Sequence, residues 1–153
     1  MIRQTRLVAR LLASQTTLSL ATTNADGTSY VTPLFYLSGD GLTLCWFSSF
    51  SSRHSRNLRR QPAAAIAVYR PTEKWREIRG VQMRGVASMV TDPERISAIT
   101  AAYGARFRLG PALRRALARS RLYEFRPEWI RYLDNSKRFG YRFELSFAGR
   151  WSC

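Results

Sequence analysis

Residues 42–68 constrain the fold most, because they carry two strand signals joined by a polar turn and a short helix. Residues 42–47 are an apolar run rich in leucine and aromatic side chains, which predicts a strand. Residues 48–52 contain four serines, and a helical segment that stops before a proline begins at Arg53. Residues 63–68 predict the next strand. This order places hydroxyl groups and cations where a helix begins.

Four side chains at this helix start can bind an anion: Ser48, Ser52, Arg53 and His54. The first N–H groups of a helix attract anions, and arginine adds a planar fork of donors suited to phosphate. One interpretation is a phosphate-binding turn. The other is a capped surface helix whose arginines are solvated. The residues alone leave both open, because single motifs of this kind occur often by chance.

The rest of the chain predicts short strands separated by turns. Residues 24–27 and 38–41 are turn signals that end in glycine, and two successive hairpins indicate an antiparallel meander. Pro127 and Glu128 are expected to end a strand. About seven short strands with three or four short helices fit a small closed barrel with helices outside. Strands are expected at 17–23, 28–37, 42–47, 63–68, 75–90, 122–126, 129–133 and 141–147, and helices at 2–14, 93–103 and 112–120 besides the one at Arg53.

Two strands contain residues that disturb a regular sheet. Pro33 removes a ladder donor, so its strand is expected to be an edge strand or to be interrupted there, and a flat ligand could lie against the backbone of an interrupted edge. The other interpretation is that Pro33 is an ordinary edge-strand proline without a ligand. Gly80 and Gly85 indicate a bulge or the close approach of another backbone. Gln82 is expected to share a face with both glycines, which would leave its amide little shielded. Alternatively, it is a polar residue on the solvent face.

Composition excludes several classes of protein. The 153 residues suit one domain, and a hydrophobic content of 45% indicates a globular protein. No run approaches the roughly 18 apolar residues of a membrane helix, and the N-terminal region lacks the apolar core of a signal peptide. We therefore expect a cytoplasmic protein. The formal net charge is +15, but the basic residues, nearly all arginine, are dispersed along the chain and indicate no particular partner.

Side-chain chemistry is sparse. His54 is the only histidine, and the two cysteines, Cys45 and Cys153, have no metal-binding spacing. The sequence contains no nucleotide-binding glycine motif and no serine-hydrolase motif, and its ten acidic residues show no acid/base pair. We therefore expect no metal and no catalytic side chain, so that a cofactor would carry any reaction.

Several motifs, in order, resemble one family. Residues 20–37, L-A-T-T-N-A-D-G-T-S-Y-V-T-P-L-F-Y-L, resemble the opening of the pyridoxamine 5′-phosphate oxidase-like superfamily, an FMN-binding split β-barrel. Residues 51–68 resemble its phosphate-binding turn, helix and strand. Residues 79–85 and 133–140 are most similar to a small bacterial subgroup, the YhbP-like proteins. The resemblance covers nearly the whole chain.

The resemblance implies a cofactor site. The strand from Thr32 matches the one that lies along the isoalloxazine ring, and Phe47 with Ser48 matches an aromatic–hydroxyl pair. The triplet from Ser52 to His54 matches Ser-Arg-Lys, whose two cations grip the FMN phosphate, with histidine here in place of lysine. Gln82 is offset by two residues from a flavin-contacting glutamine. The implied FMN-binding residues are Thr32, Pro33, Leu34, Phe47, Ser48, Ser52, Arg53, His54 and Gln82.

The resemblance also implies an architecture and a function. We expect a single domain over residues 1–153 with a mainly β (α+β) fold, a six- to seven-stranded antiparallel split β-barrel with short flanking helices. The family's homodimers hold FMN between subunits, so the resemblance implies a homodimer. It also implies an FMN-dependent oxidoreductase acting on a small molecule. Vitamin B6 oxidation is not implied, because Leu133 follows residues 130–132 where the true oxidases have tryptophan, and residues 136–147 lack Arg-x-His.

Two other functions stay open from the sequence. Relatives of this fold also bind deazaflavin or haem, so the chain could be a flavin, deazaflavin or haem binder without turnover. A basic nucleic-acid-binding barrel is an alternative of another class. Against it, aromatic and basic residues do not interleave in one stretch, as base-stacking surfaces require.

Overall fold

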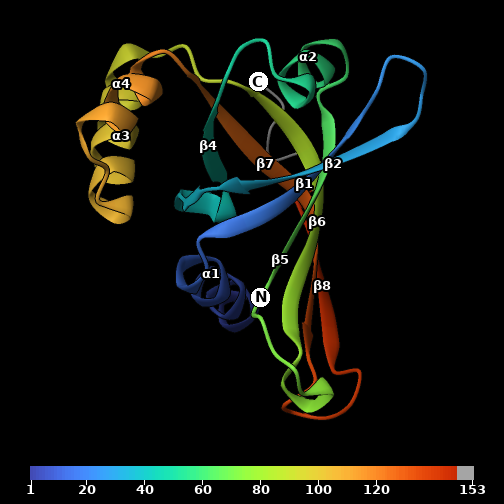
Figure 1. Cartoon of the computed structure of the whole chain (residues 1–153). Coiled ribbons are helices and arrows are strands. Elements are labelled where there is room, and N and C mark those ends of the chain that lie inside the picture. The colour runs from blue at the N-terminus through green and yellow to red at the C-terminus, as the bar shows by residue number, and fades with distance from the viewer. Residues whose placement is uncertain (148–153) are drawn as a thin grey trace.

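The computed structural model describes residues 1–147, which form a curled antiparallel sheet of eight strands with four α-helices around it (Figure 1). This confirms the mainly β class with flanking helices. The strands are β1 (Thr17–Thr23), β2 (Ser29–Phe35), β3 (Leu37–Ser38), β4 (Leu44–Ser48), β5 (Ala63–Tyr69), β6 (Arg79–Met89), β7 (Arg121–Asp134) and β8 (Arg142–Ser146). The helices are α1 (Ile2–Ser14), α2 (Arg53–Arg60), α3 (Pro93–Phe107) and α4 (Pro111–Ala118), with 3-10 turns η1 (Asp40–Leu42) and η2 (Trp75–Glu77).

One residue joins the two end strands of the curled sheet. Its strand order is β2-β1-β5-β6-β7-β4-β3, with β8 paired to β7. The end strands β2 and β3 are consecutive in the chain and are separated only by Tyr36. The buried Tyr36 donates its hydroxyl to the Leu12 carbonyl at 2.6 Å and its N–H to the Thr16 carbonyl at 3.0 Å. The expected single strand 28–37 is therefore two strands, divided where the chain passes from one edge of the sheet to the other.

Pro33 lies on an edge strand, as the sequence predicts. In the described chain β2 pairs only with β1, where Pro33 faces Ser19. A proline on this strand removes a donor that no second neighbour requires.

The prediction that Pro127 and Glu128 end a strand is wrong. β7 continues through both residues to Asp134. The register pairs Gly85 with Pro127 but Arg84 with Trp129, so that Glu128 is the extra residue of a bulge. A bulge is one of the few places within a sheet that tolerates proline, because the ladder is already interrupted there.

Position 85 has no room for a side chain, because the β7 backbone lies against it. A Cβ atom at this position would lie 2.0 Å from the Arg126 carbonyl oxygen. The predicted close approach is therefore confirmed. The expectation that Gln82 shares a face with both glycines is wrong for Gly85. Gln82 is exposed and Gly85 is buried, because positions three apart on a strand point to opposite faces.

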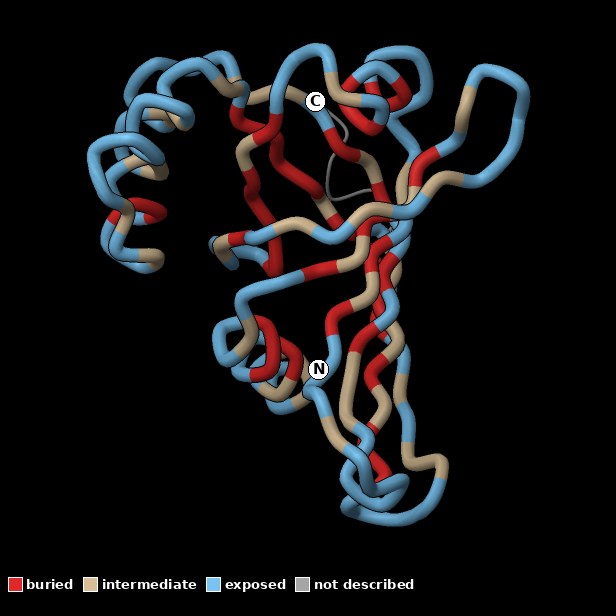
Figure 2. The backbone as a smooth tube through the Cα atoms, in the orientation of Figure 1, coloured by how far each residue is buried: buried red, intermediate tan, exposed pale blue. Residues whose placement is uncertain are grey.

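The core lies inside the curl and under α1. Figure 2 shows buried segments along the strands and on one side of α1, whereas α3 and α4 are mostly exposed. Apolar side chains at i and i+4 on α1 explain this, since Val8 and Leu12 face the same way and both are buried. Trp46 and Phe125 fill the interior from the paired strands β4 and β7.

Replacing Gly85 with alanine tests the close approach. We expect Gly85→Ala to lower the free energy of unfolding by at least about 2 kcal/mol, because backbone must move to admit the methyl group. Gly110→Ala is the matched control, since Gly110 has a φ of −73° and nothing lies within 4 Å of its Cβ position. Its cost should stay below about 1 kcal/mol. Equal urea midpoints for the two variants would contradict the account of this bulge.

Candidate functional site

The turn between β4 and α2 is built by serines. Ser48 is the last residue of β4, and Ser52 is the N-cap of α2. The Ser52 hydroxyl oxygen accepts the N–H of Ser55 at 3.3 Å. Serine is favoured here because its oxygen satisfies a first-turn N–H that has no acceptor within the helix. The turn therefore holds the start of α2 directly after a buried strand.

His54 ties this turn together from inside. Its Nε2 lies 2.7 Å from the Ser48 hydroxyl and 3.2 Å from the Ser52 hydroxyl. The residue is only 8% exposed, and burial lowers the pKa of His54 below its ordinary value. The imidazole is therefore neutral at pH 7 and orients two hydroxyl groups. This differs from the second phosphate-gripping cation that the resemblance implies at this position.

Arg53 is the cation at the exposed start of α2. Its guanidinium carbon lies 5.5 Å from the centre of the Tyr30 ring, and within residues 1–147 it has no carboxylate within 4 Å. With Arg56 and Arg60 it lines one side of a hollow of about 360 Å³. The turn between β1 and β2, with Asp26, forms the other side. Positive charge is thus concentrated where α2 faces this hairpin.

Asn57 fixes α2 against the hairpin. Its buried side-chain amide donates to Thr22 Oγ1 and to Asn24 Oδ1, each at 3.0 Å. Sequence reasoning did not single out Asn57. An asparagine inside a short helix was the available signal, because that residue is unfavourable there unless its amide has partners.

The two sides of β2 differ in exposure. Tyr30, Thr32 and Leu34 are half-buried, whereas Pro33 points the other way and is exposed. Because Arg53 leans over Tyr30, the alternation places Thr32 and Leu34 in line with this cation along the strand.

Phe47 and Gln82 occupy different surroundings. Phe47, next to Ser48, packs edge-on against Tyr103 of α3 with ring centres 5.1 Å apart. Gln82 is exposed on β6 and lines a separate hollow of about 420 Å³ with Arg131. The structure thus joins Ser48, Ser52 and His54 by hydrogen bonds and places Arg53 at the same helix start, whereas the Phe47 side chain packs towards α3 and Gln82 lies outside this group within one chain.

A buried acidic group was missed by sequence reasoning. Glu124 is ion-paired with Arg95 and with Arg126, and all three border a hollow of about 670 Å³ between the sheet and α3. The sequence signal that could have identified Glu124 is an acidic residue within the apolar run of β7. Burial and the charge of Glu124 raise the pKa of the nearby Cys45 to about 11, so this thiol is protonated and unreactive at pH 7. Cys153 lies outside the described residues.

Comparison with known proteins identifies the family. The sequence matches the pyridoxamine 5′-phosphate oxidase family over residues 5–134, and the chain belongs to that family. No curated protein sequence matches the chain. Within residues 1–147, no helix is long and apolar enough to cross a membrane.

Solved structures share the fold at low sequence identity. The conserved hypothetical protein Rv2991 from Mycobacterium tuberculosis has a TM-score of 0.78 and 21% identity, over 94% of this chain and 92% of that one. The haem storage protein HutZ from Vibrio cholerae has a TM-score of 0.65 and 22% identity, over 82% and 89%. An FAD-binding protein from Mesorhizobium loti has a TM-score of 0.61 and 18% identity, over 82% and 90%.

Acid should weaken the His54 contacts. Burial depresses the folded-state pKa of His54 below the ordinary 6.5. Its contribution to stability is therefore present above pH 6.5 and is lost as pH falls through the folded-state pKa. We expect wild type to be more stable than His54→Gln at pH 7.5, and this gap in unfolding midpoint to narrow towards pH 5. Because the chain has one histidine, the comparison isolates its titration. A gap that widens on acidification would contradict a buried neutral ring.

Proposed function

We propose that the protein is an FMN-binding flavoprotein that acts as an oxidoreductase on a small molecule. Family membership supports flavin chemistry, and the start of α2 supports a phosphate-bearing flavin. The observation that carries the proposal is the exposed Arg53 guanidinium beside a helix start whose hydroxyl groups are already oriented by His54.

The donors at this helix start fit a phosphate group. The Ser52 hydroxyl oxygen accepts the N–H of Ser55, and the Ser52 carbonyl oxygen accepts the N–H of Arg56 at 3.0 Å. The N–H groups of Arg53 and His54 precede these and have no acceptor within the helix. They point outward at the positive end of the helix dipole, where an anion is stabilised. Arg53 adds charge and the Ser48 hydroxyl adds a polar contact, whereas the Ser52 hydroxyl would first have to turn away from Ser55 Oγ, to which it donates at 2.7 Å.

The remaining predicted contacts follow from the direction of β2. With the phosphate at Arg53, the ring system would extend along Thr32, Pro33 and Leu34, with Phe47 at the end of β4. FMN supplies electron or hydride transfer when bound. The protein residues bind and orient it. Among residues 1–147, the Cys45 thiol is protonated at pH 7 and the Nε2 atom of His54 is already engaged with two serine hydroxyls, so neither is placed to act as a nucleophile. Gln82 lies on β6 opposite Ala67 and is outside the group at α2, so its predicted flavin contact has no support from the arrangement of one chain.

Flavin is favoured over haem by the state of the single histidine. HutZ, a structural neighbour, is a haem storage protein. In this chain the Nε2 atom of His54 is engaged with two serine hydroxyls and the ring is buried. Ligation of haem iron by this histidine would require the α2 turn to open. Deazaflavin remains the alternative that the same phosphate contacts would also serve.

We further propose a homodimer. β2 is an edge strand whose outer side carries Val31 and Phe35, which are 65% and 56% exposed. Tyr69 and Phe139 are also exposed, at 60% and 78%. Val31 and Phe35 lie on the unpaired edge strand, where exposed apolar side chains are costly in water and mark a surface that a second subunit could cover.

Loss of Arg53 should remove the preference for FMN over riboflavin. We expect wild type to bind FMN at least about tenfold more tightly than riboflavin, because a charge-assisted bond to phosphate contributes about 1.5–3 kcal/mol. Arg53→Gln should abolish most of this preference. Arg76→Gln, at an exposed arginine that lies over the Trp75 ring, is the control and should leave it unchanged. Fluorescence titration of all three proteins measures it, and equal affinity of wild type for both flavins would refute the phosphate site.

The dimer should depend on the exposed edge. Light scattering of FMN-loaded wild type is expected to give twice the chain mass of 17.6 kDa. Val31→Lys should give a monomer with weaker FMN binding, because a charge on the covered strand opposes association. Leu113→Lys places the same charge on α4, at a side chain 59% exposed, and should remain dimeric. A flavin-loaded wild type with the mass of one chain would overturn the homodimer.

A further inference from the structure

A second basic hollow lies between α1 and the far end of the sheet. It measures about 490 Å³ and is lined by three arginines from different elements, Arg10 of α1, Arg70 after β5 and Arg79 at the start of β6. Tyr132 of β7 lies on its sheet side, and Leu7 and Leu11 form an apolar wall on α1. We call this group of residues the arginine hollow.

The hairpin register brings two of these charges together. Tyr69 pairs with Gly80 across β5 and β6, and the N–H of Arg70 donates to the Arg79 carbonyl at 2.9 Å. Arg70 and Arg79 are therefore directly opposite each other. Like charges in that position destabilise a sheet. Arg10 of α1 adds a third positive charge to the same hollow.

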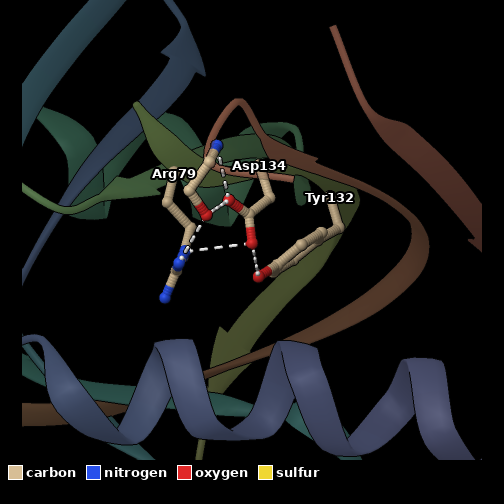
Figure 3. A network of polar contacts seen from close by, with 4 residues as sticks. Arg79, Tyr132 and Asp134 are labelled. Atoms are coloured by element: carbon tan, nitrogen blue, oxygen red, sulfur yellow. Dashed lines mark hydrogen bonds and ion pairs between the residues drawn. The ribbon is translucent and has the colours of Figure 1, made fainter. Parts of the chain in front are cut away.

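One carboxylate partly compensates them. Asp134, paired with Arg79 across β6 and β7, has its Oδ2 3.1 Å from the Arg79 Nε (Figure 3). The same carboxylate accepts hydrogen bonds from the Tyr132 hydroxyl and from Ser136. Burial would raise the pKa of Asp134, but these hydrogen bonds and Arg79 outweigh it and hold the pKa below its ordinary value. Asp134 is therefore ionised at pH 7, and it neutralises Arg79 alone.

Two guanidinium groups stay uncompensated. Across residues 1–147, neither Arg10 nor Arg70 has a carboxylate oxygen within 4 Å. Three arginines and one aspartate leave the hollow with a charge of about +2, which matches a phosphate dianion, and guanidinium forks suit phosphate oxygens. We propose that the arginine hollow binds a phosphate dianion, either free or as the head of a phosphomonoester whose apolar end contacts Leu7 and Leu11.

This site is distinct from the proposed FMN site. The two share no lining residue, and Figure 1 places α2 at one end of the curled sheet and the loop between β5 and β6 at the other. Binding at the arginine hollow therefore does not depend on flavin binding at Arg53.

Calorimetric titration with inorganic phosphate at low ionic strength tests the proposal. All proteins carry Arg53→Gln, so that the turn at α2 contributes little phosphate binding. In this background Arg10→Gln and Arg70→Gln should each weaken phosphate binding about tenfold, because each removes a charge-assisted contact. Arg6→Gln is the control, since it removes the same charge from an exposed position on the same helix. Its affinity should stay within about twofold. Arg79 is kept, because its loss would leave the buried Asp134 carboxylate unpaired.

Phenyl phosphate, titrated in parallel, distinguishes the two sources of the anion. Tighter binding than inorganic phosphate would indicate a phosphomonoester that uses the apolar wall, and equal binding would indicate free phosphate. Absence of phosphate binding in the Arg53→Gln protein would overturn the proposal. An equal loss of affinity in Arg6→Gln, Arg10→Gln and Arg70→Gln would also overturn it, since it would show attraction to net charge alone.

Discussion

The fold depends on the junction at Tyr36, where the two ends of the sheet meet. A strand that leaves one edge must reach the other through a single residue, and that residue is held by hydrogen bonds to Leu12 and Thr16 at the end of α1. Burial raises the pKa of Tyr36, so its hydroxyl remains a donor at any physiological pH. This contact couples the first helix to the passage of the chain from one edge of the sheet to the other. β4 and the turn that leads into α2 follow directly from it along the chain.

The bulge at Gly85 and Pro127 is the second constraint on the curl. It lets β7 run through a proline. It also brings the β7 backbone so close to position 85 of β6 that no side chain fits there. The long pair β6–β7 thereby reaches from the hollow beside α3 to Asp134 at the opposite end. The two basic hollows are lined by residues of α2 and by residues next to the β5–β6 loop. Figure 1 shows these two elements at opposite ends of the curled sheet. The position of the charges therefore follows from the topology, although the arginines are dispersed in the sequence.

Much of the architecture was predictable because local signals agree with it. Alternating strands, glycine turns and the serine before Arg53 gave the strands, the hairpins and the start of α2 at nearly their observed positions. Four features were not predictable. Pro127 conflicts with strand propensity, and only the tertiary bulge resolves that conflict. The break at Tyr36 depends on closure of the whole sheet. The inward orientation of His54 depends on hydrogen bonds with Ser48 and Ser52 that a sequence pattern does not specify. The grouping of Arg10, Arg70 and Arg79 likewise requires three segments to be placed in space.

The account rests on a flavin phosphate held at the start of α2, and one measurement tests it most directly. The protein is saturated with FMN, freed of unbound ligand by gel filtration, and its absorption spectrum is recorded. The account predicts a flavin spectrum with an equimolar amount of FMN retained per chain, and release of that flavin when Arg53 is replaced by glutamine. A colourless protein after gel filtration, or a purified protein that shows a haem spectrum and takes up no FMN, would contradict it.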